Sequence, residues 1–176
     1  AQIYGDQVFW VENTTDLASE SPIFVSHEIS TSADGAYSVH AADMDGDGDM
    51  DLLSASIEDD KIAWYENNGS ESFTEHTIST SANGAISVHA VDVDGDGDMD
   101  VLSASADDDK IAWYENNGSE SFTEHTISTS ANGAISVHAV DVDGDGDMDV
   151  LSASSVDSKI AWYENDGSES FTEHAI

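Results

Sequence analysis

The sequence predicts an all-β protein, a β-propeller-type tandem repeat of four-stranded blades in a partial ring of about 3.5 blades. Three observations predict this fold. The pattern DxDGDGDMD occurs three times at intervals of 49 residues. Each interval contains four short β-rich runs bounded by turn residues. No run of about a dozen residues shows the 3.6-residue period of an amphipathic helix. A parallel β-solenoid is the alternative, although its coils are normally shorter.

The repeat extends over the whole sequence. Residues 30–78, 79–127 and 128–176 align without a gap, and the second and third copies differ at only five positions. The first 29 residues resemble the end of a further copy, because Trp10 falls in a run that matches the segment around Trp64. We therefore expect one continuous repeat array over residues 1–176. Its units are a partial blade with a hairpin and a linker, 1–35, and three blades, 36–84, 85–133 and 134–176.

The second repeat illustrates the expected elements. An acidic loop separates its first two strands, and a turn of three aspartates at 107–109 separates the second strand from the third. The residues at 116–119 tolerate positive φ and predict a hairpin-type turn before the fourth strand. The four expected strands cover residues 86–93, 99–105, 110–115 and 122–128.

The composition is strongly acidic. The chain has 38 Asp and Glu residues against three lysines and no arginine, which gives a formal net charge of −35. Nucleic acid and anionic membrane surfaces are not expected as partners, because both attract clustered positive charge. No run of about 18 apolar residues is present, so membrane insertion is not expected. Hydrophobic residues make up 39% of the chain, which indicates a folded protein and not a disordered acidic tail.

Each acidic loop has the residue types that calcium requires. Calcium prefers six to eight oxygen ligands, with carboxylates supplying most of the charge. Aspartates at loop positions 1, 3, 5 and 9 supply carboxylates, glycine at position 6 allows a sharp bend, and position 7 can present its carbonyl. We expect about one Ca²⁺ ion per complete repeat, three in all. The predicted metal-binding residues are Asp43, Asp45, Asp47, Asp49, Asp51, Asp92, Asp94, Asp96, Asp98, Asp100, Asp141, Asp143, Asp145, Asp147 and Asp149.

An EF-hand and a merely solvated acidic turn are the alternatives for these loops. An EF-hand requires a bidentate glutamate at position 12 and two flanking helices. Position 12 is instead Ser54, Ser103 or Ser152, and the flanking segments are expected to be strands. Magnesium is less favoured because it prefers rigid octahedral sites that keep several waters. The identical spacing of three such loops favours metal sites over solvated turns.

The loop and its flanking strands resemble the FG-GAP and VCBS-type calcium-binding β-propeller repeats, of which the integrin α-subunit head is the best-known relative. The resemblance rests on DxDxDGxxD, as in residues 92–100, on Val101-Leu102 after the loop, and on Ile111-Ala112-Trp113-Tyr114 beyond it. No Phe-Gly or Gly-Ala-Pro signature is present, so the chain looks like the VCBS-type branch and not like an integrin. The resemblance implies calcium between the first two strands of each blade, a mostly structural role and an extracellular setting, with adhesion or carbohydrate contacts.

These observations predict a calcium-stabilised structural or adhesive protein that is extracellular, secreted or on the cell surface. Propellers have four to eight blades, so this chain does not close a ring alone. Its unpaired edges and faces favour self-association into a closed oligomer or a filament, or contact with neighbouring blades. The alternatives are a lectin-like carbohydrate-binding propeller module and a segment of a larger secreted propeller protein. An enzyme is not expected, because near-identical repeats provide no unique catalytic group of residues.

Other recurring residues have two interpretations each. The tryptophans Trp10, Trp64, Trp113 and Trp162 either pack between blades or stack on sugars, and packing between blades is favoured because a repeated strand aromatic more often belongs to the core. The histidines fall in two registers, His27, His76, His125 and His174 in one and His40, His89 and His138 in the other, for which blade packing is favoured over zinc binding or catalysis. Candidate N-glycosylation sites are Asn13, Asn68 and Asn117.

Overall fold

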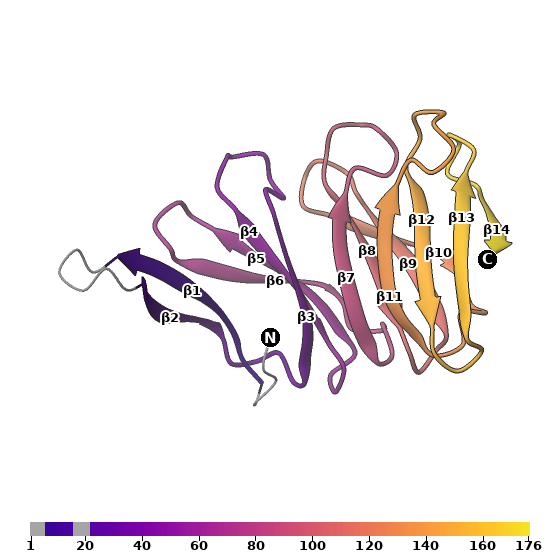
Figure 1. Ribbon diagram of the computed structural model, residues 1–176. Helices are drawn as coiled ribbons and strands as arrows, with labels where there is room; N and C mark the ends of the chain where they lie inside the picture. The colour runs from indigo at the N-terminus through magenta and orange to yellow at the C-terminus, as the bar shows by residue number, and fades with distance from the viewer. Residues whose placement is uncertain (1–5, 16–21) are drawn as a thin grey trace.

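The computed structural model describes residues 6–15 and 22–176. Over these residues the chain forms fourteen β-strands joined by loops and turns, without a helix. Figure 1 shows the sheets following one another in chain order, as an open array that does not close into a ring. The predicted all-β fold of four-stranded repeats in a partial ring is therefore confirmed. The described part of the chain has no helix that is long and apolar enough to cross a membrane.

Three complete sheets, which we call blades 1 to 3, follow a two-stranded hairpin, and each blade is an antiparallel meander in chain order. The hairpin consists of β1 (Val8–Thr15) and β2 (Pro22–Ser30). Blade 1 consists of β3 (Ala36–Ala42), β4 (Asp51–Ser56), β5 (Lys61–Asn67) and β6 (Phe73–Ser79). Blade 2 consists of β7 (Ala85–Val91), β8 (Asp100–Ser105), β9 (Lys110–Asn116) and β10 (Phe122–Ser128). Blade 3 consists of β11 (Ala134–Val140), β12 (Asp149–Ser154), β13 (Lys159–Asn165) and β14 (Phe171–Ala175).

The strands of blade 2 begin and end within two residues of the ranges that the sequence predicts. The first strand ends at Val91, because the Asp92 carboxylate already accepts a hydrogen bond from the backbone N–H of Gly95 in the loop. Asp109 has a φ of 57° in the turn between β8 and β9, where the run of aspartates predicts a turn.

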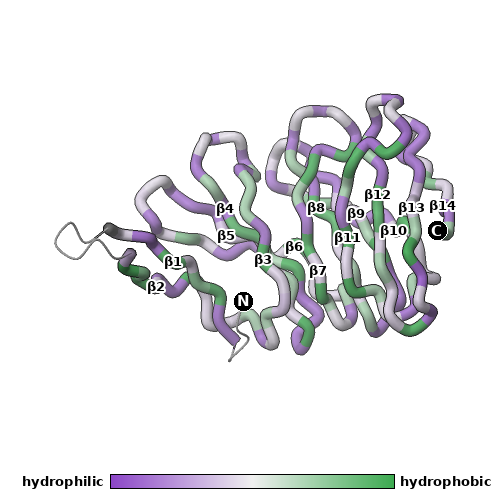
Figure 2. The backbone as a smooth tube through the Cα atoms, viewed as in Figure 1, coloured by the Kyte–Doolittle hydropathy of each residue, from purple (hydrophilic) through white to green (hydrophobic). Residues whose placement is uncertain are grey.

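The hydrophobic core lies between neighbouring blades. Trp64 of blade 1 packs in one cluster with Tyr114 of blade 2, and Trp113 of blade 2 packs in the corresponding cluster with Tyr163 of blade 3. The side chains of Trp64 and Trp113 are 1% and 0% exposed. The alternative that these two indoles stack on sugars is therefore wrong. Figure 2 shows hydrophobic segments within the strands and mostly hydrophilic loops.

The β1–β2 hairpin occupies the position of the outer two strands of a preceding blade. Trp10 lies opposite His27 across the hairpin, as the equivalent residues of blade 1 lie opposite each other. Val8 is 2% exposed because it packs in a cluster with Ala63 and Tyr65 of blade 1. The hairpin therefore continues the stack of sheets on the N-terminal side.

The two histidine registers form two kinds of contact. On the fourth strand of each blade the imidazole stacks on a tryptophan, as His125 does on Trp113 with ring centroids 4.6 Å apart. On the first strands, which lie side by side, the rings of His40, His89 and His138 form a row with successive centroids 4.6 and 4.5 Å apart. Both contacts fit the blade-packing interpretation. Within the described residues, the groups of side chains that could hold a metal ion contain aspartate alone.

The lysines of the chain share one structural position, the first residue of the third strand in each blade. Lys110 Nζ donates a hydrogen bond of 2.8 Å to Oε1 of Glu124 on the fourth strand. Lys110 pairs with Ser105 at the end of β8, whereas Asp100 at the beginning of β8 belongs to the acidic loop. The length of the strand separates the two by about 17 Å. The same glutamate contact is made by Lys61 and Lys159, so all three lysines are engaged away from the loops.

Candidate metal centres in the aspartate loops

The three aspartate loops, residues 43–51, 92–100 and 141–149, join the first and second strands of each blade. The first aspartate of each loop anchors its backbone. In blade 1, Asp43 Oδ1 accepts a hydrogen bond of 2.8 Å from Gly46 N, and Oδ2 accepts one of 3.0 Å from Gly48 N. Both glycines have positive φ, 76° and 94°, which other residues adopt only with strain. The loop therefore closes around the carboxylate of its first residue.

The last aspartate of each loop is buried and joins the loop to the third strand. Asp100 is 0% exposed. Its Oδ2 accepts a hydrogen bond of 3.0 Å from Val93 N, and its Oδ1 accepts one of 2.7 Å from Asn116 N. Asp51 and Asp149 make the equivalent contacts in the other blades. These bonds fix the carboxylate in place beside the loop.

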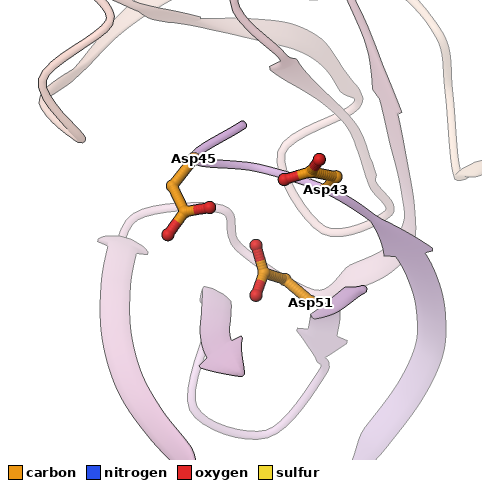
Figure 3. Close-up of side chains that lie close together, drawn as sticks. All are labelled: Asp43, Asp45 and Asp51. Atoms are coloured by element: carbon orange, nitrogen blue, oxygen red, sulfur yellow. The ribbon is translucent and has the colours of Figure 1, made fainter. Parts of the chain in front are cut away.

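Three carboxylates of each loop meet at one point. One oxygen from each of three aspartates lies within 4.8 Å of the others in every loop. Figure 3 shows this group in blade 1, where Asp43 and Asp45 from the start of the loop face Asp51 from its end. Positions 1 and 3 belong to all three groups, position 9 completes the group in blades 1 and 3, and position 5 completes it in blade 2. The groups are Asp43, Asp45 and Asp51; Asp92, Asp94 and Asp96; Asp141, Asp143 and Asp149.

The remaining predicted ligands lie outside these groups. The residues at loop position 7 direct their carboxylates toward the glycine of the turn after the third strand, as Asp98 does toward Gly118. Sequence reasoning assigned this position a backbone carbonyl ligand, which leaves its side chain free to point to the turn. The predicted residues outside the three groups are Asp47, Asp49, Asp98, Asp100, Asp145 and Asp147.

The loop carboxylates are crowded and have no lysine beside them. The pKa of Asp94 is raised, first by desolvation and further by the neighbouring carboxylates of Asp96 and Asp92. Desolvation raises the pKa of Asp100 to about 6, although the hydrogen bonds that it accepts from backbone N–H groups oppose this shift. The pKa values of Asp45, Asp51 and Asp143 are raised in the same direction. A bound divalent cation would reverse this effect by favouring the charged carboxylates.

The residues present fit a calcium site. Three carboxylates within reach of one point can each supply one or two oxygens, and loop carbonyls and water can complete six to eight ligands. Magnesium also takes oxygen donors, but it prefers a strict octahedral site that keeps several waters, whereas a site rich in carboxylates and loop carbonyls favours calcium.

Sequence reasoning missed the asparagine that ends the third strand. Asn116 donates its backbone N–H to Asp100, and its side-chain Nδ2 donates a hydrogen bond of 3.2 Å to the carbonyl oxygen of Met99. The same contacts recur at Asn67 and Asn165. The signal was present in the sequence, because this asparagine follows the last aspartate of each loop by 16 residues.

A cleft between neighbouring loops was also missed. It has a volume of about 450 Å³ and lies between the loops of blades 2 and 3. Its lining combines apolar side chains with loop carboxylates, among them Val93, Met99, Met148 and Asp94. The methionines occupy loop position 8, whose repetition could have been noticed, but the cleft itself depends on how two blades pack.

The three candidate glycosylation sites are exposed. Asn13 lies on β1, whereas Asn68 and Asn117 lie in the turns after β5 and β9. In both turns the asparagine side chain accepts a hydrogen bond of 3.0 Å from the backbone N–H two residues later. Glycosylation at these positions stays a prediction.

Comparisons with known proteins agree with the fold. The family described as FG-GAP-like repeat matches four overlapping stretches, residues 3–54, 43–103, 92–152 and 141–176. A solved structure of an Agrocybe aegerita lectin, described as specifically recognising non-reducing terminal N-acetylglucosamine, is similar with a TM-score of 0.59 and 16% identity. The similarity covers 98% of this chain and 52% of the lectin chain, so the chain spans about half the length of that protein. At this identity the likeness supports the fold alone. No curated protein matches the chain.

Proposed function

Because the chain belongs to the FG-GAP-like repeat family, we propose that it is a calcium-stabilised structural or adhesive repeat protein, with one Ca²⁺ ion in each aspartate loop. Its predicted relation to FG-GAP repeats is confirmed, whereas the VCBS-type branch stays a prediction. The observation that carries the proposal is the meeting of three carboxylates within 4.8 Å in each of three loops. All three lysines are engaged elsewhere, so no lysine compensates the negative charge of the loops.

Calcium would stabilise the folded chain through these loops. Each pair of like charges at this separation costs about 1–4 kcal/mol at a dielectric constant typical of protein surfaces. An ion that binds only the folded state stabilises it by mass action. Three dications would leave a net charge of about −29 from the formal −35, so the protein would remain strongly anionic.

The proposal includes an extracellular, secreted or cell-surface setting and no enzymatic activity. Calcium sites with dissociation constants of about 0.1–1 mM are typical of extracellular modules, because calcium is abundant there. The near-identical loops support a shared structural task in each blade, since catalysis requires one distinct group of residues.

Self-association is the second part of the proposal. The open array leaves apolar side chains exposed on its two terminal sheets, including Phe24 on the hairpin at 63% and Ile160 on blade 3 at 56%. Exposed apolar faces of this kind favour protein contacts. A closed oligomer or a filament would cover them.

The calcium proposal is tested by thermal unfolding with calcium and with a chelator, for the parent chain and two matched variants. Asp94→Asn removes a carboxylate of the blade 2 group, whereas Asp98→Asn removes an equal charge from a side chain that faces Gly118. We expect chelation to lower the melting temperature of the parent chain. Asp94→Asn should reduce the calcium-dependent rise, and Asp98→Asn should retain it. If calcium left the melting temperature of all three proteins unchanged, the proposal would be rejected.

A carbohydrate-binding module is the second candidate function. The cleft between the loops of blades 2 and 3 favours this function. Its lining places apolar methionine side chains beside carboxylates that could hold calcium. A glycan array with the parent chain, with chelator and with Met99→Ala tests this candidate. Binding that requires both calcium and Met99 would support it, and the absence of any glycan binding would reject it. The chain as a segment of a larger propeller protein is compatible with either function.

A further inference from the structure

The face of each blade that receives the next blade, which we call the trailing face, is built from the same residue positions throughout. In blade 1, Met44 and Ile62 on this face are 3% and 0% exposed. In blade 3 the equivalent residues, Val142 and Ile160, are 45% and 56% exposed. The trailing face of blade 3 is therefore an interblade surface whose covering blade is not among the described residues.

The hairpin exposes the strand positions that cover a trailing face inside the chain, with Phe9 in place of an alanine and Val11 in place of a tyrosine. The residues that cover the trailing face of blade 1 include Ala112 and Tyr114 of blade 2, which are 0% and 1% exposed. The repeat places Phe9 and Val11 of β1 at the equivalent positions, and they are 49% and 46% exposed. We call the surface around Phe9 and Val11 the leading face of the hairpin. It is the surface that a blade presents to its predecessor.

We propose that the trailing face of blade 3 binds the leading face of the β1–β2 hairpin of a second copy, so that copies stack head to tail. This inference rests on the proposed self-association and names the surfaces that carry it. A second copy fits because it carries the same two positions that cover trailing faces inside the chain. The contact joins two different surfaces, so it leads to a ring if the rotation closes and to a filament if it does not.

Charge and contact area determine the strength of this association. The hairpin supplies two strands where a complete blade supplies four, so the interface between copies is smaller than an internal one. Each copy carries a formal charge of −35, and this repulsion opposes association at low salt. We therefore expect assembly to depend on protein concentration and to strengthen with calcium and salt.

Analytical ultracentrifugation over a range of protein concentrations in calcium tests the inference with three variants. Ile160→Asp places a charge on the trailing face, and Phe9→Asp places one on the leading face. Val156→Asp is the matched control, because Val156 is 77% exposed and blade 2 has Asp107 at the equivalent position. Melting temperatures close to that of the parent chain establish that each variant is folded.

We expect the parent chain and Val156→Asp to assemble. Ile160→Asp and Phe9→Asp should each raise the dissociation constant about tenfold or more, because a charge is then buried in the contact. An equimolar mixture of these two variants should form a dimer and nothing larger, since each retains the face that the other has lost.

The other outcomes separate the two ideas. An assembled parent chain whose assembly survives Ile160→Asp would overturn the named surfaces and leave self-association in place. Loss of assembly in both variants without recovery in the mixture would overturn the head-to-tail arrangement. A parent chain that stays a single copy at every concentration would overturn both the inference and the proposed self-association, while leaving the calcium proposal to its own test.

Discussion

Blades 2 and 3 differ at only five sequence positions, yet their trailing faces differ sharply in exposure. Ile111 of blade 2 is 0% exposed, whereas its equivalent Ile160 is 56% exposed. Val93 is 3% exposed, whereas Val142 is 45% exposed. The same residues thus form core in one blade and surface in the next. The comparison teaches that burial in this fold is decided by the neighbouring blade and not by the blade's own sequence.

The opposite faces of the same two blades are alike. Tyr114 and Tyr163 are both 1% exposed, because each of these blades has a predecessor that covers it. Stability in such an array is approximately a sum of terms within each repeat and terms between nearest neighbours. Blade 3 retains the stabilising terms within its own repeat, but it has a neighbouring blade on one side only.

The largest expected effect tests this contrast directly. Ile111→Ala should lower the free energy of unfolding by about 2–4 kcal/mol, because it leaves a cavity between two blades. Ile160→Ala should lower it by less than about 0.5 kcal/mol at protein concentrations where single copies dominate. Chemical denaturation at saturating calcium measures both values. Equal losses of unfolding free energy in the two variants would contradict the contrast between the blades.

The next effect concerns a feature that the two blades share. Gly118 and Gly167 have φ values of 70° and 73°, and a Cβ added to either glycine would collide with the carboxylate of the loop aspartate at position 7. Replacement by alanine should cost about 1–2 kcal/mol in both blades, since the strain and the collision are local.

Gly95→Ala is the control for this pair, because Gly95 has a φ of 76° but no atom near an added Cβ. It should cost about 1 kcal/mol, from backbone strain alone. Denaturation curves that show a large difference between Gly118→Ala and Gly167→Ala would mean that the neighbouring blade also governs the turns.

The smallest effect concerns the row of histidines, in which His89 lies between two others and His138 lies at the end. Desolvation, and secondarily the charges of His40 and His138, lowers the pKa of His89 from 6.5 to about 4. The unfolded chain therefore binds this proton first as the pH falls. The contribution of His89 to the free energy of unfolding is fully present above pH 6.5 and is lost as the pH falls toward 4.

His89→Gln should reduce the loss of unfolding free energy at low pH by about 1 kcal/mol. The value is modest because solvent screens the electrostatic effect on a partly exposed ring. The measurement is the difference in unfolding free energy between parent and variant at pH 7.5 and pH 5, in excess calcium. A difference that does not change with pH would contradict the assignment.

The sequence predicted the meander and the loops because both are local. The alternation and the turn residues define the strands of blade 2 to within two residues, and the aspartate spacing places Asp92 and Asp94 together. The burial of Trp113 between two blades confirms the packing interpretation, which its recurrence on a strand of each repeat had favoured. The cleft beside Met99 could not be predicted, because it arises where two blades meet. The direction of the Asp98 side chain depends on a turn of the same blade that is distant in sequence.

The central claim is that the aspartate loops bind calcium and that this binding stabilises the folded blades. Calorimetric titration of the chelator-treated chain with calcium tests it most directly. The account predicts binding of about three ions per chain and a melting temperature that rises with calcium. The absence of binding at millimolar calcium, with an unchanged melting temperature, would contradict it.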